Sequence, residues 1–239
     1  MRVPAVAIAL LLTCAVSALA EDFSFSADSM SGAMTEGRER AVLTGNAVVV
    51  SGGMRINADR IVLYGDEFRF AECSGRVNVV DDERGLRLST ETLFYDRRDK
   101  LSRLTGPSVM EDRQNKVVIK GDYIENDDVR KIAVVQINVR ILKENLSCRA
   151  EFARYDREAN TLELSGSPVV RRQKDDFRAS TILVDLDTED IVLVGAVSGT
   201  VAAGSDKEKK PAEIQADVPA EVPAEVPADE TADDGKAAP

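Results

Sequence analysis

Residues 43–50 read LTGNAVVV and residues 56–61 read INADRI, and both motifs return along the chain. The glycine of the first motif recurs about every 30 residues, with one doubled interval that indicates a copy lost near Gln136. The recurring glycines are Gly45, Gly75, Gly106, Gly166 and Gly195. Self-similarity at a fixed period of this length is typical of repeat proteins, in which stacked units share one continuous core.

The second motif recurs in step with the first. Each copy has a small residue, then a polar one, and an apolar residue three places after the small one. The copies are residues 58–61, 90–93, 121–124, 150–153 and 179–182. Because both motifs keep their spacing, we interpret them as parts of one repeated unit.

Turn-forming residues divide each unit at two fixed places. They fall at residues 51–53, 81–85, 112–115, 143–145 and 174–176, and again at 65–66, 96–99, 126–128, 156–160 and 187–190. These segments are rich in Asp, Asn and Gly, which favour turns. The runs between them alternate in polarity, as in Leu86-Arg87-Leu88, and this alternation indicates strands with one buried face. The sequence therefore predicts an all-β fold of stacked antiparallel hairpins, about 30 residues per repeat.

The alternation changes phase inside the strands. Leu86, Leu88 and Thr90 share one face, but the next apolar residue, Leu93, follows Thr90 by three places instead of two. Such a change at a small residue is typical of a bulge or bend. We expect the recurring glycines to bend the other strand of each unit at a comparable height. The stacked bends would then fold the sheet into two walls around one apolar interior.

The first 20 residues have the pattern of a signal peptide. Arg2 precedes an apolar run over residues 3–16, and Ala18-Leu19-Ala20 fits a cleavage site after Ala20. The segment Leu11-Leu12-Thr13-Cys14 loosely resembles a bacterial lipobox, in which Cys14 would carry lipid. We favour cleavage, because only nine apolar residues separate Arg2 from Leu12.

The composition changes again after Val201. Residues 202–239 contain no aromatic residue and repeat a Val-Pro-Ala-Glu unit. Proline at every fourth position excludes a helix and removes hydrogen-bond donors from any strand. We expect this segment to be a disordered, acidic, Pro/Ala-rich tail. The predicted domains are the signal peptide at residues 1–20, one folded unit at 21–201 and the tail.

Composition argues against several classes of function. The net charge of −11 gives the chain no general attraction for nucleic acid, and the absence of His removes the commonest proton-transfer side chain. The acidic clusters at residues 81–83, 126–128 and 187–190 stand at turn positions and lack the spacing of a calcium loop. We therefore expect no enzyme activity, no metal site and no cofactor.

These motifs resemble a known family. Leu-x-Gly followed by alternating valines, then Ile-x-Ala-Asp-x-Ile, is similar to the OstA-like domain of the LptA-type periplasmic lipopolysaccharide-transport family, over roughly residues 28–201. The resemblance implies an open, V-shaped β-jelly roll whose interior holds lipid acyl chains. It implies a periplasmic carrier or bridge between the inner and outer membranes. Its ligand would be lipopolysaccharide or a related envelope lipid, and its partners would join edge to edge.

The predicted lipid-binding residues point to the interior of the two walls. They are Ile56, Ala58, Ile61, Leu63, Leu88, Leu93, Ile119, Ile124, Cys148, Ala153, Phe177 and Ile182. Without the resemblance, a closed hydrophobic core would be the simpler interpretation of these residues. The mixture of small and aliphatic side chains favours some free space between the walls.

Two further expectations concern the edges and the cysteines. An open strand is expected at each end of the stack, near residues 41–50 and 191–201, and open edges invite pairing with another chain. Cys73 and Cys148 should both face the interior about three strands apart, too far for a disulfide.

One alternative function remains open. A structural or adhesive β-solenoid would bind polysaccharide or protein along its face, without lipid. Such a protein would place aromatic residues on its outer surface, but the aromatic residues look few and scattered in the sequence.

Overall fold

The computed structural model describes residues 23–33, 35 and 39–202. The predicted signal peptide, Cys14 and the acidic tail lie outside these residues. Apart from one short 3-10 turn at Asp66–Phe68, the regular structure here is entirely β. The strands are β1 (Phe23–Ser26), β2 (Ser29–Ala33), β3 (Arg40–Ser51), β4 (Met54–Tyr64), β5 (Phe70–Asp81), β6 (Leu86–Asp96), β7 (Leu101–Asp112), β8 (Val117–Asp127), β9 (Ile132–Lys143), β10 (Leu146–Asp156), β11 (Thr161–Ser165), β12 (Val169–Arg172), β13 (Asp175–Arg178), β14 (Thr181–Asp185), β15 (Ile191–Val194) and β16 (Ser198–Thr200).

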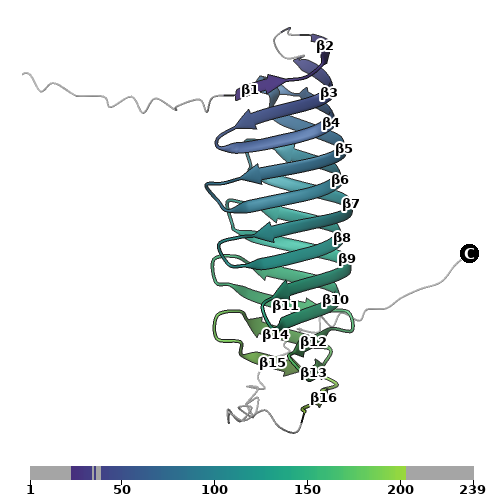
Figure 1. Ribbon diagram of the computed structural model, residues 1–239, viewed down its shortest axis with the longest axis vertical. Helices are drawn as coiled ribbons and strands as arrows, with labels where there is room; N and C mark the ends of the chain where they lie inside the picture. Colours follow the sequence, from purple (N-terminus) through teal and green to yellow (C-terminus); the bar gives the residue numbers. More distant parts are fainter. Residues whose placement is uncertain (1–22, 34, 36–38, 203–239) are drawn as a thin grey trace, which may run out of the picture. The chain divides into compact units, whose positions relative to one another are not determined.

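The strands form one antiparallel sheet that does not close on itself. From β3 to β10 each strand pairs with the next strand in sequence, which gives the stacked hairpins of Figure 1. The first and last strands of the described sheet do not pair with each other. The predicted all-β fold of repeated antiparallel hairpins in an open β-jelly roll is confirmed.

A bend crosses the middle of every long strand. The register between neighbouring strands shifts at this height in each pair from β3–β4 to β9–β10, for example between Asn57 and Arg60 of β4. Gly45, Gly75 and Gly106 all have a positive φ there. Asp59 and Glu91, which directly follow the small residue of the second motif, face Gly75 and Gly106, and Asp28 faces Gly45. The predicted bends are confirmed at both motifs.

The repeat that lacks the glycine bends at the same height with other residues. In β9, Ile137 and Asn138 have φ values of 64° and 57°, in the left-handed region that most residues avoid. The Asn138 side chain donates a hydrogen bond of 2.5 Å to the Asp122 carboxylate on β8. Asn tolerates this conformation better than other non-glycine residues, so the bend survives without glycine.

The bends divide the sheet into two facing walls. The first wall contains residues 47–51 of β3, residues 54–58 of β4 and the strand halves stacked on them; the second contains residues 40–44 of β3, residues 60–64 of β4 and theirs. Toward the C-terminal end the halves become separate strands. There β12, β13 and β16 continue the first wall, while β11, β14 and β15 continue the second.

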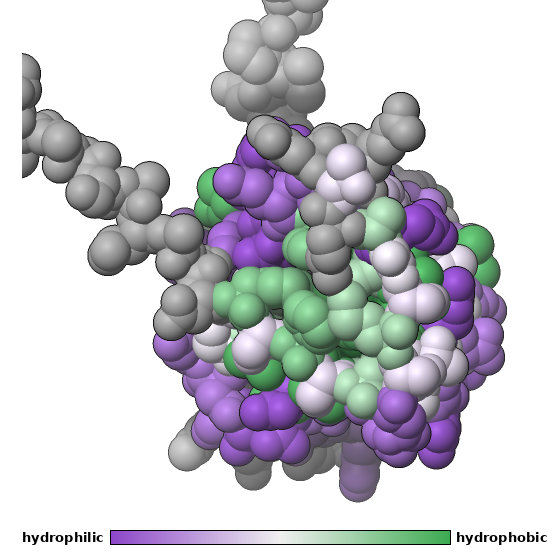
Figure 2. Space-filling model, turned by 90° about the horizontal axis from the view of Figure 1, so that it is seen from above, coloured by the Kyte–Doolittle hydropathy of each residue, from purple (hydrophilic) through white to green (hydrophobic). Residues whose placement is uncertain are grey.

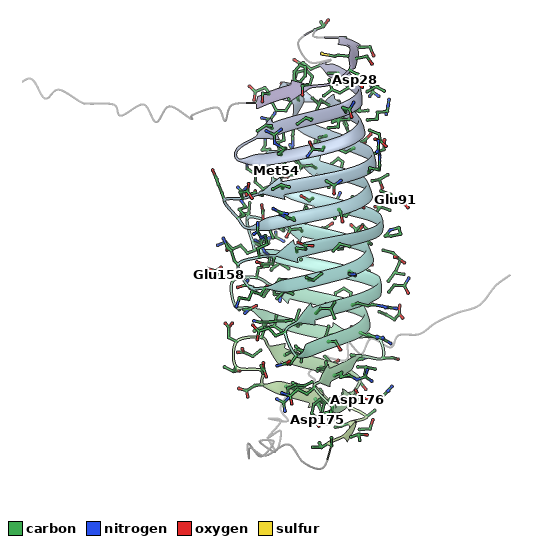
Figure 3. The ribbon with its side chains drawn as sticks, viewed as in Figure 1. Asp28, Met54, Glu91, Glu158, Asp175 and Asp176 are labelled. Atoms are coloured by element: carbon green, nitrogen blue, oxygen red, sulfur yellow. The ribbon has the colours of Figure 1, made fainter. Side chains whose placement is uncertain are left out.

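The hairpin turns lie opposite the bends, in two rows. In Figure 3 Glu91 lies along the long side of the stack that carries the bends, and Glu158 lies along the side that carries the turns. The first-wall row contains turn residues 52–53, 82–85, 113–116, 144–145 and 173–174, and the second-wall row contains 65–69, 97–100, 128–131, 157–160 and 186–190. We call the seam between these two rows the mouth.

Aspartates at the strand ends fix the turns. The Asp127 carboxylate accepts hydrogen bonds from the backbone N–H groups of Val129 and Arg130, and Asp185 does the same for Asp187 and Thr188. These contacts assign the acidic clusters to turn formation, as the sequence predicts.

The edges of the sheet differ from the prediction at one end. Residues 41–50 are not an edge, because β1 pairs with the second half of β3 and β2 with its first half. The open edges at the N-terminal end are therefore β1 and β2. At the other end the prediction agrees with the structure, since β15 and β16 each pair on one side only. These strands are only four and five residues long, too short for a pattern of polarity to identify them, and they were missed.

The two cysteines are buried and unpaired, as predicted. Their predicted separation was wrong. Cys73 is on β5 and Cys148 on β10, five strand steps along the sheet instead of three, or roughly 24 Å at the usual strand spacing. The prediction counted one strand per repeat between the two cysteines. Each repeat contributes two strands, and Cys73 and Cys148 lie in different walls. Burial raises the pKa of each thiol to about 12.

Candidate functional site: the interior between the two walls

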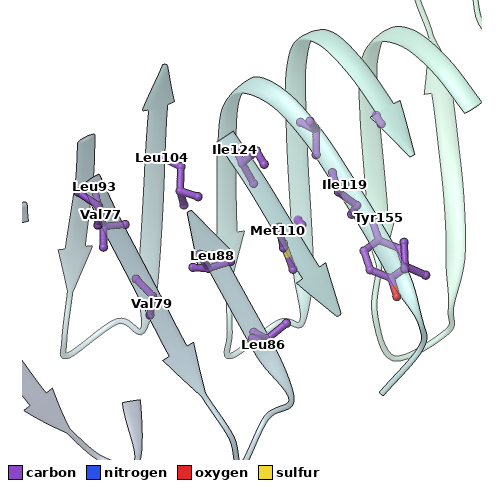
Figure 4. Packing of buried hydrophobic residues seen from close by; sticks show 14 of the residues in the cluster. Val77, Val79, Leu86, Leu88, Leu93, Leu104, Met110, Ile119, Ile124 and Tyr155 are labelled. Atoms are coloured by element: carbon purple, nitrogen blue, oxygen red, sulfur yellow. The ribbon is translucent and has the colours of Figure 1, made fainter. Parts of the chain in front are cut away.

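The predicted inner-wall residues all face the interior or pack against it. Eleven of them have exposures between 0% and 6% and belong to one hydrophobic cluster that runs along the stack; the exception is Phe177, which is partly buried against that cluster. Figure 4 shows Leu88, Ile119 and Ile124 within this cluster, and Tyr155 beside them with its hydroxyl group. The alternation of polarity along the strands therefore places these side chains on the inner face of the sheet, as the sequence predicts.

The interior is mostly apolar, and its buried polar residues lie near the mouth except Thr90 and Ser108, whose hydroxyls hydrogen-bond to each other over 2.8 Å at a bend. The other buried polar residues gather at the ends of the strands, next to the turns: Ser51, Asp81, Asp96, Ser102, Asp112, Asn126 and Asn160. A cross-section through the stack is thus amphipathic.

The space between the walls is filled by side chains. Ile61, Leu104 and Ile141 have no measurable exposure, and a crevice beside Val49 and Tyr95 is too narrow for a water molecule. The sheet itself is open, but the mixture of small and aliphatic residues interlocks instead of leaving the expected free space.

A polar cluster joins the two walls at the middle of the mouth. The Arg157 guanidinium lies 3.4 Å from the Asp112 carboxylate of the first wall, and the Tyr155 hydroxyl donates to the same carboxylate over 3.2 Å. The Asn115 side chain donates to the backbone carbonyl of Arg157 over 3.0 Å. Burial raises the pKa of the Tyr155 phenol, and the Asp112 charge acts in the same direction.

Arg84 extends this cluster toward the N-terminal end. Its guanidinium reaches from the first-wall row to Asp128 of the second-wall row, with an N–O distance of 3.2 Å. It also pairs with Asp81 of its own wall. Asp128 in turn accepts a hydrogen bond of 2.8 Å from Arg157, so one carboxylate links both arginines.

Contacts of the same kind close the rest of the mouth. Near β1, Arg97 donates to the Ser51 hydroxyl over 3.3 Å and lies 4.5 Å from the Phe23 ring centroid. Toward the other end, Lys143 of the first wall lies 3.8 Å from the Asp187 carboxylate. Arg172 donates over 3.3 Å to the backbone carbonyl of Glu189. Sequence reasoning missed these contacts, because their partners lie between 17 and 46 residues apart.

The apolar interior reaches the N-terminal end of the stack, next to β1 and β2 (Figure 2). Figure 2 shows this end with hydrophobic residues at its centre and hydrophilic residues around them. Phe23 of β1 stacks on Phe68 across the mouth, with ring centroids 6.1 Å apart, and both rings pack against the core.

The outer face of the second wall carries a row of aromatic side chains. Tyr64, Phe70 and Phe94 lie on adjacent strands, with successive ring centroids 5.4 Å and 5.8 Å apart. Arg103 on β7 continues the row, 5.7 Å from the Phe94 centroid. The expectation that the aromatic residues are scattered was therefore wrong. They stand far apart in sequence, and pairing of the strands brings them together.

A shallow hollow of about 320 Å³ lies on the outer face of the second wall at its C-terminal end. Its lining includes the exposed side chains of Leu183 and Val192. In residues 23–33, 35 and 39–202 no helix is long and apolar enough to cross a membrane. The same residues contain no group of three or more Asp, Glu or Cys side chains arranged to hold a metal ion.

Comparison with known proteins gives one family match. The model of the family described as LptA/(LptD N-terminal domain) LPS transport protein matches residues 26–132 and 125–190. Together these matches span both walls from β2 to the loop before β15. No curated protein sequence matches the chain.

Among solved structures, the chain is similar to LptH from Pseudomonas aeruginosa. That structure is described as the LptA homologous periplasmic component of the conserved lipopolysaccharide transport device. The match has 13% sequence identity and covers 76% of this chain and 96% of that chain, with a TM-score of 0.23. A likeness at this score supports no conclusion about this chain.

Proposed function

Because the chain belongs to the LptA/LptD N-terminal domain family of lipopolysaccharide transport proteins, we propose that it is a periplasmic lipid carrier or bridge. It holds the acyl chains of lipopolysaccharide, or of a related envelope glycolipid, between the inner and outer membranes. Its role is binding and not catalysis. The observation that carries the proposal is the single apolar face along the stack, enclosed by a sheet that is not closed by strand pairing.

The acyl chains would lie against the predicted inner-wall residues. Ile56, Leu88 and Ile119 belong to the first wall, and Ile61, Leu93 and Ile124 face them from the second. Side chains fill the interior, so binding requires the walls to separate along the mouth. The bends can act as the hinge, because the two halves of each strand are already joined there by an irregular backbone.

Burial of an acyl chain can offset the loss of contacts between the two walls. Each methylene removed from water contributes about 0.8 kcal/mol, so an acyl chain of about a dozen methylenes contributes on the order of 10 kcal/mol before ordering costs. This gain offsets the contacts that the two walls lose when they part. The polar residues at the mouth would remain at the surface, where a lipid's polar head group would also lie.

Edge strands would provide the contacts with transport partners. At one end β1 and β2, and at the other β15 and β16, offer backbone groups that pair with no further strand among the described residues. Strand addition at these edges would join copies of the chain, or other transport components, end to end. The apolar interiors would then follow one another in line.

Native mass spectrometry of the protein purified from its own envelope tests the proposal. We expect a mass increase that matches lipopolysaccharide or a related glycolipid, and we expect that increase to disappear after unfolding and refolding without lipid. A protein that arrives empty from its envelope would contradict lipid transport as its function.

Two observations favour the alternative of a structural or adhesive β-solenoid. Side chains fill the interior, and the aromatic row of Tyr64, Phe70 and Phe94 offers ring faces on which sugars can stack. An empty native protein that binds polysaccharide, with binding lost on replacement of Phe94 by Ala, would support this second function.

A further inference from the structure

We propose that the charged contacts across the mouth form a latch, which holds the two walls closed in the empty protein and opens when lipid enters. The latch consists of Arg84, Asp112, Asp128 and Arg157. The inference rests on the proposed function, since it describes how a ligand reaches the interior. It concerns a part of the molecule that the acyl chains themselves would not touch.

Among the described residues, hydrogen bonds between strands do not cross the mouth, so only side-chain contacts hold the two walls together there. Within each row, the turns are connected by backbone hydrogen bonds, such as Arg113 N–H to Gly85 O and Arg157 N–H to Lys131 O. Separation of the walls leaves these bonds and the strand pairing intact. Only the core contacts and the side-chain contacts between the two rows must break.

The central contacts are well shielded from water. The side chains of Arg157 and Asp112 are 7% and 1% exposed, and Asp128 is 14% exposed. Charge-assisted hydrogen bonds at such low exposure are stronger than those of a solvated surface pair. This part of the mouth therefore contributes to closure more than the exposed pair of Lys143 and Asp187 does.

The latch can open without leaving an arginine unpaired. Arg84 holds Asp128 across the mouth but also Asp81 of its own wall, and Arg157 holds Asp112 across the mouth but also Asp128 of its own row. When the walls part, the pairs Arg84–Asp81 and Arg157–Asp128 remain. Two arrangements of the same charges are thus available, one closed and one open, as a switch requires.

The closed arrangement also leaves one buried group unsatisfied. Asn126, which is 2% exposed and lies next to the latch, has a side-chain oxygen without a hydrogen-bond partner in the part of the chain that the structure describes. A buried polar atom without a partner is unfavourable, and water would reach this one if the mouth opened. Opening would remove this energetic cost. The free-energy difference between the closed and the open arrangement is therefore smaller than it would be if Asn126 had a partner.

Asp128→Asn tests the latch. The change removes the Arg84–Asp128 contact across the mouth. It also removes the Arg157–Asp128 pair, but that pair is present in both the closed and the open arrangement and so favours neither. We expect fluorescently labelled lipopolysaccharide to load about three-fold faster, the factor expected for loss of a partly exposed ion pair. Hydrogen exchange at the inner-wall strands should also become faster.

Glu125→Gln is the matched control. Glu125 lies on β8, three residues before Asp128, and its replacement removes a carboxylate and breaks an ion pair of 2.8 Å with Arg103 on the outer face. Its loading and exchange rates should equal those of the wild type. Equal rates for Asp128→Asn and the wild type would overturn the latch.

A covalent bridge tests the same inference in the opposite direction and does not depend on the stability of Asp128→Asn. Lys143→Cys and Asp187→Cys, joined by a short bismaleimide, would connect the two walls where their side chains already meet. We expect lipopolysaccharide loading to be lost in the bridged protein and kept in protein that carries the reagent on one cysteine only. Equal loading in both would overturn the latch.

These results separate the latch from the proposed function. If Asp128→Asn speeds exchange at the inner walls but neither protein binds lipopolysaccharide, the latch stands and lipid transport fails. If both proteins bind lipopolysaccharide at equal rates and the bridge has no effect, lipid binding stands and the latch fails.

Discussion

At the residue scale, the bends depend on glycines held against the strand before them. Gly166 has a φ of +75°, and a Cβ atom built on it would lie 2.6 Å from the Glu151 Cβ. Both the backbone conformation and the close approach exclude a side chain at this position. The regular spacing of such glycines is the reason that the bends could be predicted from the sequence.

Gly166→Ala should destabilise the protein by about 2 kcal/mol, from the cost of a left-handed alanine together with the close contact. Urea unfolding measures the loss. Gly166→Asn should lose less, because Asn adopts this conformation more readily while it introduces the same Cβ. If the two variants were equally destabilised, the conformational part of this explanation would be wrong.

At the element scale, the hairpin units could be predicted and their termination could not. Alternating polarity and turn residues define β3 to β10, because each long strand has one buried face. By contrast, β1 and β2 have only four and five residues and are mostly exposed, so neither presents a buried face long enough to be recognised in the sequence. The strands that form the N-terminal edges could therefore be identified only from the pairing of β1 and β2 with β3 in the structure.

The open edge at β15 leads to a test of end-to-end assembly. Val192 and Val194 are 44% and 52% exposed on this strand. Replacement of both by Lys should weaken self-association in sedimentation experiments, because charge on an edge strand opposes the approach of another sheet. Leu183→Lys is the matched control, since Leu183 is 42% exposed but lies one strand inward. If the double variant associated as strongly as the wild type, assembly through this edge would be refuted.

At the scale of the whole molecule, the sequence predicts which side chains face inward but not how tightly they meet. Inward residues follow from alternation and from the change of phase at each bend, so Ile61 and Ile124 were placed correctly. Free space depends on how the side chains of one wall fit those of the other. The contacts at the mouth likewise join residues of different repeats, such as Asp112 and Arg157, and no local pattern connects them.

The most direct test of lipid binding between the walls is photocrosslinking from a matched pair of aromatic positions. p-Benzoylphenylalanine would replace Phe177, which packs against the interior, or Phe94, which lies on the outer face. After loading with lipopolysaccharide and irradiation, Phe177 should capture acyl-chain carbons and Phe94 should not. Acyl chains captured equally at Phe94, or at neither position, would contradict a lipid held between the two walls.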